Sequence, residues 1–143
     1  MLKVEKYTQD DEEKVVAFIR KADPTAKPNR QVLLRSVLIK DDKCVVGMVS
    51  YEPYDNMGVI RYFLYDARVA GTDIMVGMFF ELYHVAQTEG VKKLIAQIPT
   101  PDVRMLFEML GFSRIDKDLS DFKNWVRNDA TIMLINLEGK AGA

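Results

Sequence analysis

Hydrophobic and polar positions change their spacing several times along the chain, and each change predicts a new element. Residues 2–7 alternate apolar and charged side chains, which is typical of a half-buried strand. Residues 10–22 instead place Val15, Phe18 and Ile19 on one face of a helix. The acidic side chains of this segment come first and the basic ones last, an order that favours a helix because it complements the helix dipole.

The middle of the chain predicts three strands. Two β-rich runs, 36–40 and 44–51, are joined by Asp-Asp-Lys, which is typical of a hairpin. Residues 52–57 predict a second turn, and residues 58–65 predict the third strand of the meander. Antiparallel neighbours are therefore expected in this part of the sheet.

A long helix is predicted at 72–89. It is apolar around almost its whole circumference over residues 74–82, so we expect it to be buried. Gly77 lies inside this run, where glycine disfavours a helix by up to about 1 kcal/mol relative to alanine. We therefore expect tight packing at Gly77, against the sheet or against the backbone of a partner.

The C-terminal part predicts the remaining strands and one more helix. The elements expected there are a strand at 91–98, a helix at 102–110 and strands at 112–115 and 130–137. Gly111 directly follows the helix, where glycine commonly ends one. The polar segment 116–129 separates the last two strands, and the tail 138–143 is expected to fray. One domain over residues 1–137 is predicted.

The composition limits the kinds of protein that this chain can be. Hydrophobic residues make up 48% and charged residues 29% of the 143 residues, which is typical of a globular domain rather than a disordered chain. The formal net charge of −1 gives no overall attraction to nucleic acid or to an anionic membrane. No apolar run approaches the roughly eighteen residues of a membrane span, and the charged N-terminus is unlike a signal peptide.

Cysteine and histidine each occur once, as Cys44 and His84. These counts argue against an internal disulfide and against a metal site built from several thiolates or histidines. Cys44 begins a predicted strand, where it is expected to be a small buried hydrophobe. We therefore expect a cytoplasmic, metal-free protein with no nucleic-acid or membrane partner.

The order of these elements, with two local patterns, resembles the GCN5-related N-acetyltransferase superfamily. The first pattern is the strand, loop and helix between Gly58 and Gly90. The second is PDVRMLFEMLGFSRID, in which Gly111 and Phe112 stand as the Gly-Phe pair of the family's helix-to-strand ending. The resemblance covers roughly residues 2–137. It implies an α/β (α+β) fold, with a mixed, mostly antiparallel sheet of about seven strands flanked by three to four helices.

In this family the sheet splays between its fourth and fifth strands, where acetyl-CoA sits. The family's pyrophosphate loop reads R/Q-x-x-G-x-G/A, and residues 70–75 align with it when the helix end is matched. Asp73 and Met75 then occupy the two positions that small residues normally hold. A second alignment begins at Arg68 and keeps Gly71, but it also ends at Asp73. A carboxylate there opposes an anion that needs the backbone N–H groups of a helix start.

The resemblance also implies which residues bind the cofactor. Backbone N–H groups at the end of the fourth strand, at Phe63 and Tyr65, would polarise the acetyl carbonyl. The cofactor's phosphates would contact the following loop and helix start, namely Arg68, Gly71, Thr72, Asp73 and Ile74. Other interpretations remain open: a solvated loop arginine, a loop glycine with positive φ, and helix-capping roles for the threonine and the aspartate.

Three side chains are candidates for catalysis. Glu52 ends a predicted strand and Asp66 follows the next one, and either could take a proton from an amine, directly or through water. Phe107 stands where the family often has a tyrosine that protonates the leaving thiolate, and phenylalanine has no proton to give. Tyr83 on the central helix is therefore the candidate acid. Each of these residues also has a purely structural interpretation.

Two functions remain open from the sequence. The first is an acetyl-CoA-dependent N-acetyltransferase that modifies an unidentified amine on a small molecule or a protein. The second is a non-catalytic binding or structural module, a homodimer for example, that has kept the fold and lost acetyl-CoA. The substitutions at Asp73, Met75 and Phe107 are what the second function predicts.

Overall fold

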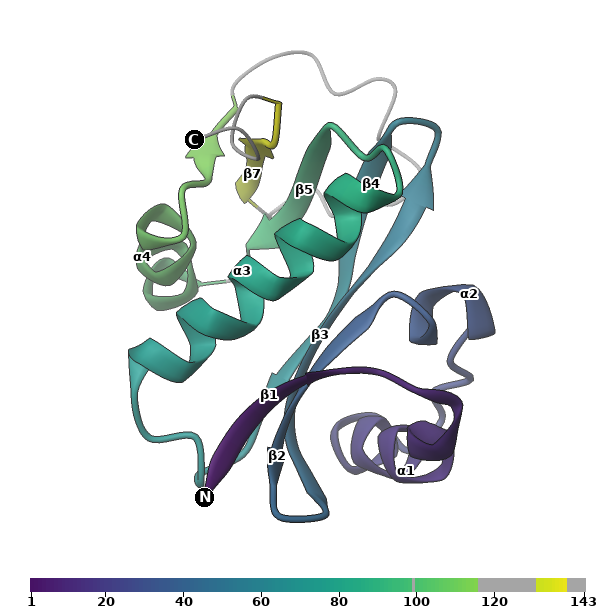
Figure 1. The fold of residues 1–143 in the computed structure, drawn as a ribbon. Helices are drawn as coiled ribbons and strands as arrows, with labels where there is room; N and C mark the ends of the chain where they lie inside the picture. Colours follow the sequence, from purple (N-terminus) through teal and green to yellow (C-terminus); the bar gives the residue numbers. More distant parts are fainter. Residues whose placement is uncertain (99, 116–130, 139–143) are drawn as a thin grey trace.

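Seven strands form one sheet in the parts of the chain that the computed structural model describes, which are residues 1–98, 100–115 and 131–138 (Figure 1). The strand order is β1-β2-β3-β4-β5-β7-β6. The strands are β1 (Leu2–Lys6), β2 (Ser36–Asp41), β3 (Cys44–Tyr54), β4 (Met57–Tyr65), β5 (Lys93–Ile98), β6 (Ser113–Arg114) and β7 (Thr131–Asn136). The helices are the short 3₁₀ turn η1 (Gln9–Asp11), α1 (Glu12–Ala22), α2 (Arg30–Leu33), α3 (Thr72–Thr88) and α4 (Pro101–Met109).

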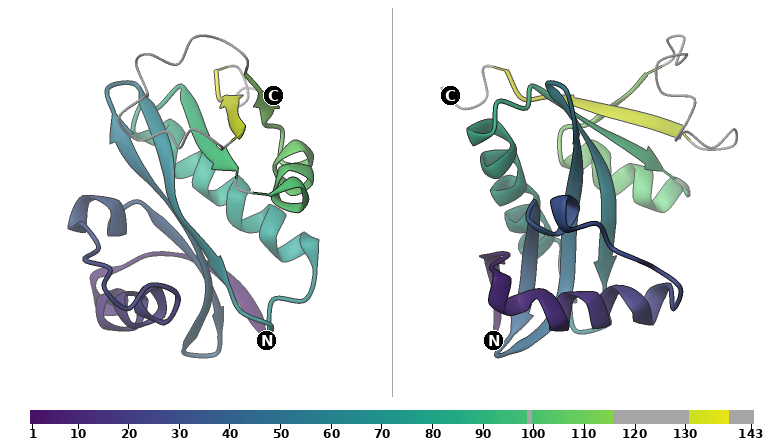
Figure 2. Two further views of the ribbon diagram at one scale, coloured as in Figure 1. Left: turned by 180° about the vertical axis from the view of Figure 1, so that it is seen from behind. Right: turned by 90° about the vertical axis from the view of Figure 1, so that its right-hand side faces the viewer.

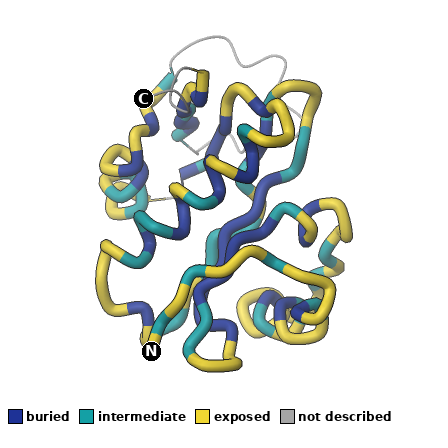
Figure 3. Tube along the Cα trace, viewed as in Figure 1, coloured by how far each residue is buried: buried dark blue, intermediate teal, exposed yellow. Residues whose placement is uncertain are grey.

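Helices cover both faces of the sheet, with α1 and α3 on opposite sides of β2 and β3 (Figures 1 and 2). The alternation of side chains along a strand explains how one strand serves two cores. In β2, Leu38 packs in the cluster that contains Val15 of α1, whereas Val37 packs in the cluster that contains Phe79 and Leu82 of α3. Buried residues accordingly follow the central strands and the sheet-facing side of α3 (Figure 3).

The sheet is mostly antiparallel, and its one parallel pairing is short. All neighbouring strands pair in antiparallel fashion except β4 and β5. These two pair only where Met57, Gly58 and Val59 face Lys93, Leu94 and Ile95. Beyond that point β5 continues to pair with β7, and β4 continues to pair with β3. The predicted splay between the fourth and fifth strands is therefore confirmed, as is the predicted class of fold.

The predicted turn at 52–57 is confirmed in place, but it is shorter than expected. Strand β3 continues to Tyr54, and only Asp55 and Asn56 connect it to β4. Asp55 takes a positive φ of 58°, which aspartate tolerates better than most residues. Pro53 fits inside the strand because β2 pairs with β3 only as far as Ser50, so no neighbour needs a proline N–H on that side.

Helix α3 is buried on one side only, which corrects the expectation that residues 74–82 are buried all round. Phe80 is 59% exposed, whereas Phe79 and Leu82 are fully buried. The polar segment predicted at 116–129 and the tail after Glu138 lie outside the described residues. No helix in the described part of the chain is long and apolar enough to cross a membrane.

The expectation of tight packing against the sheet at Gly77 is wrong. A Cβ atom added there would meet only Val4 Cγ2, at an ordinary contact distance of 3.8 Å. The close approach occurs at Gly58 in β4, where a Cβ would lie 2.7 Å from both Leu94 Cδ2 and Tyr51 Cδ2. Gly58 is one of the few β4 residues that pair with β5, so its small size lets the two strands meet.

We predict opposite effects of alanine at these two glycines. Gly77→Ala should raise the free energy of unfolding by about 0.5–1 kcal/mol, because it removes a helix-disfavouring residue without a clash. Gly58→Ala should lower that free energy by about 1–3 kcal/mol, because the buried side chains of Tyr51 and Leu94 must move. Urea unfolding of both variants checks the prediction, and equal effects would contradict it.

An ionic contact joins the start of α1 to the sheet. Asp11 is only 6% exposed; its Oδ1 lies 2.7 Å from Lys40 Nζ, and its Oδ2 accepts hydrogen bonds from the backbone N–H and the hydroxyl of Thr8. Burial alone would raise the pKa of Asp11, but the hydrogen bonds from Lys40 and Thr8 outweigh it and lower that pKa. The carboxylate is therefore stabilised in its ionised form in the folded protein.

The lowered pKa predicts a loss of stability in acid. Because the pKa of Asp11 is lower in the folded than in the unfolded chain, its contribution is present above the unfolded value of about 3.9 and is lost as the pH falls below it. Asp11→Asn should lower the free energy of unfolding by about 1–3 kcal/mol at pH 7 and make it depend less on pH between about 5 and 3. Melting temperatures across this range test the prediction. Asp10→Asn, on the exposed neighbour, is the matched control and should keep wild-type stability at pH 7.

Candidate functional site

A cavity of about 260 Å³ lies where β4 and β5 separate. It is walled by β4 on one side, by β5 on the other and by α4. Its lining residues are Ile60, Arg61, Phe63, Tyr65, Ala96, Gln97, Val103 and Phe107. We call this space the cleft. Among the described strands β4 has no pairing with β5 beyond Val59, so on this side its backbone polar groups are available to a ligand.

Aromatic rings form the inner wall of the cleft. The ring centroid of Phe63 lies 5.1 Å from that of Phe79 and 5.7 Å from that of Phe107, both in edge-to-face contact. Phe79 and Phe107 also contact each other, at 5.4 Å. Such a wall excludes water, and electrostatic interactions are stronger where water is excluded.

A β-bulge interrupts β4 beside the cleft. Val49 pairs with Phe63 and Tyr51 pairs with Ile60, so Ser50 alone lies opposite two residues of β4. The backbone N–H of Tyr62 donates to Ser50 Oγ at 3.3 Å. Bulges change the direction of a strand and are frequent next to active sites. Here the bulge immediately precedes Phe63 and Tyr65, the positions expected to present N–H groups to an acyl carbonyl.

Glu52 is held near the cleft by an ion pair. Its Oε2 accepts a hydrogen bond from Arg61 Nε at 2.8 Å, and Arg61 lines the cleft. Both side chains are about one-third exposed, at 36% for Glu52 and 33% for Arg61. The carboxylate is thus in reach of solvent and close to the cleft, although one of its oxygens already accepts a hydrogen bond from Arg61.

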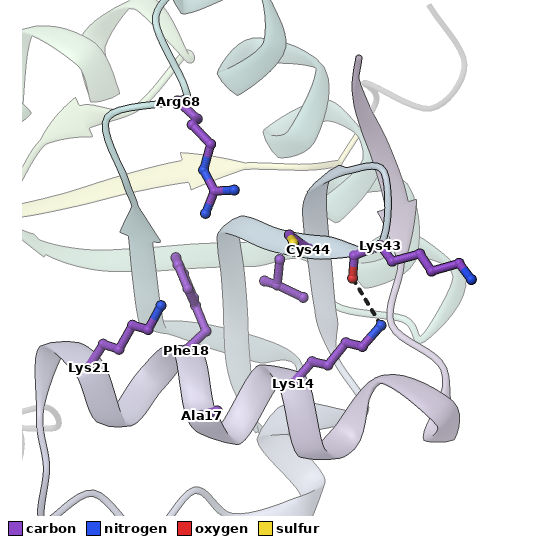
Figure 4. A pocket seen from close by; sticks show the side chains of 8 residues that line it. Lys14, Ala17, Phe18, Lys21, Lys43, Cys44 and Arg68 are labelled. Carbon is purple, nitrogen blue, oxygen red and sulfur yellow. Dashed lines mark hydrogen bonds between the residues drawn. The ribbon is translucent and has the colours of Figure 1, made fainter.

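Asp66 and Arg68 form a second pair, in the loop that follows β4. The Asp66 carboxylate accepts from the backbone N–H of Arg68 and from its Nη2, both at 2.9 Å. The hydrogen bond from the Arg68 side chain is the main reason why the pKa of Asp66 is lowered. Because a lowered pKa makes a weaker base, the environment of Asp66 does not favour proton abstraction. The Arg68 side chain lines a different cavity, on the α1 side of the sheet (Figure 4).

The start of α3 is open. Gly71 is the N-cap residue with φ −159° and ψ 159°, an extended conformation, so the alternative of a positive-φ glycine is wrong. A Cβ on Gly71 would meet nothing within 4 Å. No side chain caps the helix start, and Thr72 and Asp73 are exposed. The alternative of Thr72 as the N-cap is therefore wrong, whereas the alternative of Asp73 as an acidic residue of the first turn is confirmed.

Tyr83 lies away from the other candidate catalytic residues. It is 7% exposed, and its hydroxyl donates to the carbonyl oxygen of Leu110 at 2.9 Å, which ties α3 to the end of α4. Burial raises its pKa. It is not among the residues that line the cleft. The structure thus gives Tyr83 a structural contact, whereas Glu52 is hydrogen-bonded to Arg61, which lines the cleft.

Sequence reasoning missed Arg61 and Gln97 as lining residues and misjudged Cys44, which is exposed rather than buried. Arg61 could have been noticed, because Glu52 and Arg61 carry opposite charges on the two arms of a predicted hairpin. Gln97 offered no such signal. In the described part of the chain, no group of three or more acidic, histidine or cysteine side chains is arranged to hold a metal ion.

The architecture matches solved acetyltransferases. An acetyltransferase of the GNAT family from Staphylococcus aureus Mu50 is 14% identical, with a TM-score of 0.73 over 96% of this chain and 100% of that one. The PaiA N-acetyltransferase from Thermoplasma acidophilum, solved with coenzyme A, is 10% identical, with a TM-score of 0.68 over 95% and 99%. N-acetylglutamate synthase from Neisseria gonorrhoeae, solved with coenzyme A and N-acetyl-glutamate, is 14% identical, with a TM-score of 0.73.

This chain covers only about a third of the synthase, 35% of its length, although 96% of this chain is matched. No family model matches the sequence, and no curated protein matches it significantly. The likeness therefore concerns the three-dimensional structure and not the sequence. On this ground, and on the split between β4 and β5, the chain has the fold of the GCN5-related N-acetyltransferases.

Proposed function

We propose that this protein is an acetyl-CoA-dependent N-acetyltransferase that modifies an amine. The observation that carries the proposal is the cleft between β4 and β5, which combines an unpaired strand edge with a dry aromatic wall. The N-acetyltransferases of similar fold that were solved with coenzyme A support it. The acceptor is a small molecule or a protein that carries a free amine.

In this proposal the thioester lies in the cleft, along the open edge of β4. Backbone N–H groups between Phe63 and Tyr65 donate to the acetyl oxygen and stabilise the negative charge that develops on it. The acceptor nitrogen attacks the carbonyl carbon, and the C–S bond breaks to release the CoA thiolate. The attacking amine loses its proton to Glu52, directly or through water. The thiolate takes a proton from water, because Phe107 has none to give and the Tyr83 hydroxyl is engaged by Leu110.

The start of α3 would hold the pyrophosphate. Its first backbone N–H groups carry no side-chain cap, and Gly71 leaves open space beside them. These features favour an anion. Asp73, exposed in the first turn, opposes it through charge repulsion. We therefore expect binding to be weakened by Asp73 rather than abolished.

The alternative is a module that has kept the fold without catalysis, as a homodimer for example. Two observations favour it. Asp73 lies at the helix start, and Phe107 packs against Phe63 at the position where the family often has a tyrosine that donates a proton. The two functions differ in one measurable property, which is the affinity for acetyl-CoA.

Binding of acetyl-CoA tests the proposal directly. At a hundred times its Kd, the cofactor should stabilise the fold by about 2.7 kcal/mol, a shift of several degrees in Tm. Asp73→Asn should tighten binding about threefold to fivefold in calorimetry, because removing a charge at a helix start changes the free energy by up to about 1 kcal/mol. Asp102→Asn, in the first turn of α4, is the matched control and should leave the affinity unchanged. If the wild-type protein shows neither a shift in Tm nor heat of binding, the result favours the non-catalytic module.

The role of Glu52 makes a separate kinetic prediction. With an amine found by screening polyamines, aminoglycosides, amino acids and peptide N-termini, Glu52→Gln should lower kcat by about a hundredfold or more. The KM for acetyl-CoA should stay near the wild-type value, since the carboxylate acts on the amine. Glu13→Gln on α1 is the control. A Glu52→Gln enzyme with full activity would remove Glu52 from the mechanism without affecting the binding result.

A further inference from the structure

A second cavity, of about 330 Å³, lies on the α1 side of the sheet and is separate from the cleft (Figure 4). Helix α1, the β2–β3 hairpin with the start of β3, and the loop after β4 enclose it. Its lining residues are Lys14, Ala17, Phe18, Lys21, Lys43, Cys44, Val45 and Arg68. None of these residues lines the cleft. We call this cavity the cationic pocket, since four of its eight lining residues are basic.

The helical spacing of α1 explains why its residues share the pocket. Lys14, Ala17, Phe18 and Lys21 are three, four and seven positions apart, which places them on one face of the helix. The outer two are cationic, and the inner two form an apolar wall. Helix and hairpin are also joined directly, because Lys14 Nζ donates to the backbone carbonyl of Lys43 at 3.0 Å (Figure 4).

Arg68 completes the pocket from the loop after β4, and it points toward α1 (Figure 4). Asp66 holds its guanidinium by a hydrogen bond of 2.9 Å, which is the main reason why the pKa of Arg68 is raised; the nearby Cys44 thiol contributes less. Lys21 also acts on Asp66, whose pKa its charge helps to lower. One carboxylate thus faces a group of four cations among the described residues.

A concentration of positive charge of this kind does not follow from the composition, because the whole chain carries a formal net charge of −1. Ala17, Phe18 and Val45 add apolar surface beside the cations. A neighbouring cavity of about 280 Å³ shares Phe18 and Lys21 and extends along Leu64 and Tyr65. There is consequently room for an organic group next to the charged one.

We propose that the cationic pocket binds a phosphomonoester, with the phosphate between Lys21 and Arg68 and the organic part over Phe18. A phosphate dianion offers the acceptor oxygens that several ammonium groups and one guanidinium can share. The volume of the pocket is within the range of small-molecule sites. Such a group could come from a phosphorylated small molecule or from the 3′-phosphate of CoA. The proposal does not depend on acetyl transfer, since an anion could bind here in either proposed function.

Cys44 provides a direct reporter, because it is the only cysteine of the chain, is exposed and lines the pocket. The experiment follows the alkylation of Cys44 by iodoacetamide, a neutral reagent, during a titration with inorganic phosphate. We expect phosphate to slow the alkylation to a saturating limit, and KCl at matched ionic strength to have little effect. Nuclear magnetic resonance shifts of the backbone amides in α1 and around Lys43 should follow the same curve.

Charge variants show whether the pocket itself is responsible. Lys21→Gln with Arg68→Gln should raise the half-saturating phosphate concentration about tenfold, because two charge-assisted contacts are lost. The matched control is Lys3→Gln with Lys27→Gln, two exposed lysines outside the pocket, and should bind as the wild type does. Asp66→Asn should tighten binding, since it removes the competing carboxylate.

Equal effects of phosphate and KCl, or equal affinities of the pocket variant and its control, would overturn the proposal. A comparison of CoA with dephospho-CoA then identifies the source of the phosphate. Protection of Cys44 by CoA but not by dephospho-CoA supports the 3′-phosphate of the cofactor as the bound group. Protection by inorganic phosphate but by neither cofactor supports a separate phosphorylated molecule, and this result holds even if acetyl-CoA does not bind at all.

Discussion

Strands β4 and β5 pair over only three residue pairs, and the rest of the molecule is arranged around that limit. Gly58 lets the two strands meet there, since any side chain would strike Leu94 and Tyr51. Beyond this point each strand keeps its outer neighbour, β3 or β7, and the sheet opens. An opening inside a sheet must be filled, and here α4 and the aromatic rings of Phe63 and Phe107 line it. The cleft is therefore a consequence of how the sheet is built.

The candidate catalytic residues and their ion-pair partners fall into three groups around this opening. Glu52 and Arg61 lie beside the cleft, and Asp66 and Arg68 are paired in the loop after β4. Tyr83 is buried between α3 and the end of α4. The first group includes Arg61, which lines the cleft. Backbone N–H groups, which do not depend on side-chain identity, are the part of the site that sequence divergence leaves intact.

Charge distribution divides the two faces of the sheet. On the α1 side, four of the eight residues that line one cavity are basic, whereas the start of α3 has a carboxylate where an anion would dock. The start of α3, where the proposed cofactor site lies, is thus less favourable to phosphate than the cationic pocket. This contrast is why the two binding proposals concern different anions and are tested separately.

Local patterns in the sequence were sufficient for the order of elements, the apolar face of α1, and the end of α4 at Gly111, which takes a positive φ of 98°. These features depend on neighbours within a few residues, so the spacing of apolar and polar residues along the sequence predicts them. The turn before Met57 was predicted too long, because Pro53 is tolerated in a strand only where β2 has already ended, which is a fact of pairing rather than of local propensity. Likewise, the cationic pocket brings together α1, the start of β3 and the loop after β4, which are far apart in the chain. Only the tertiary structure decides such contacts, because they depend on which strands pair and over how many residues.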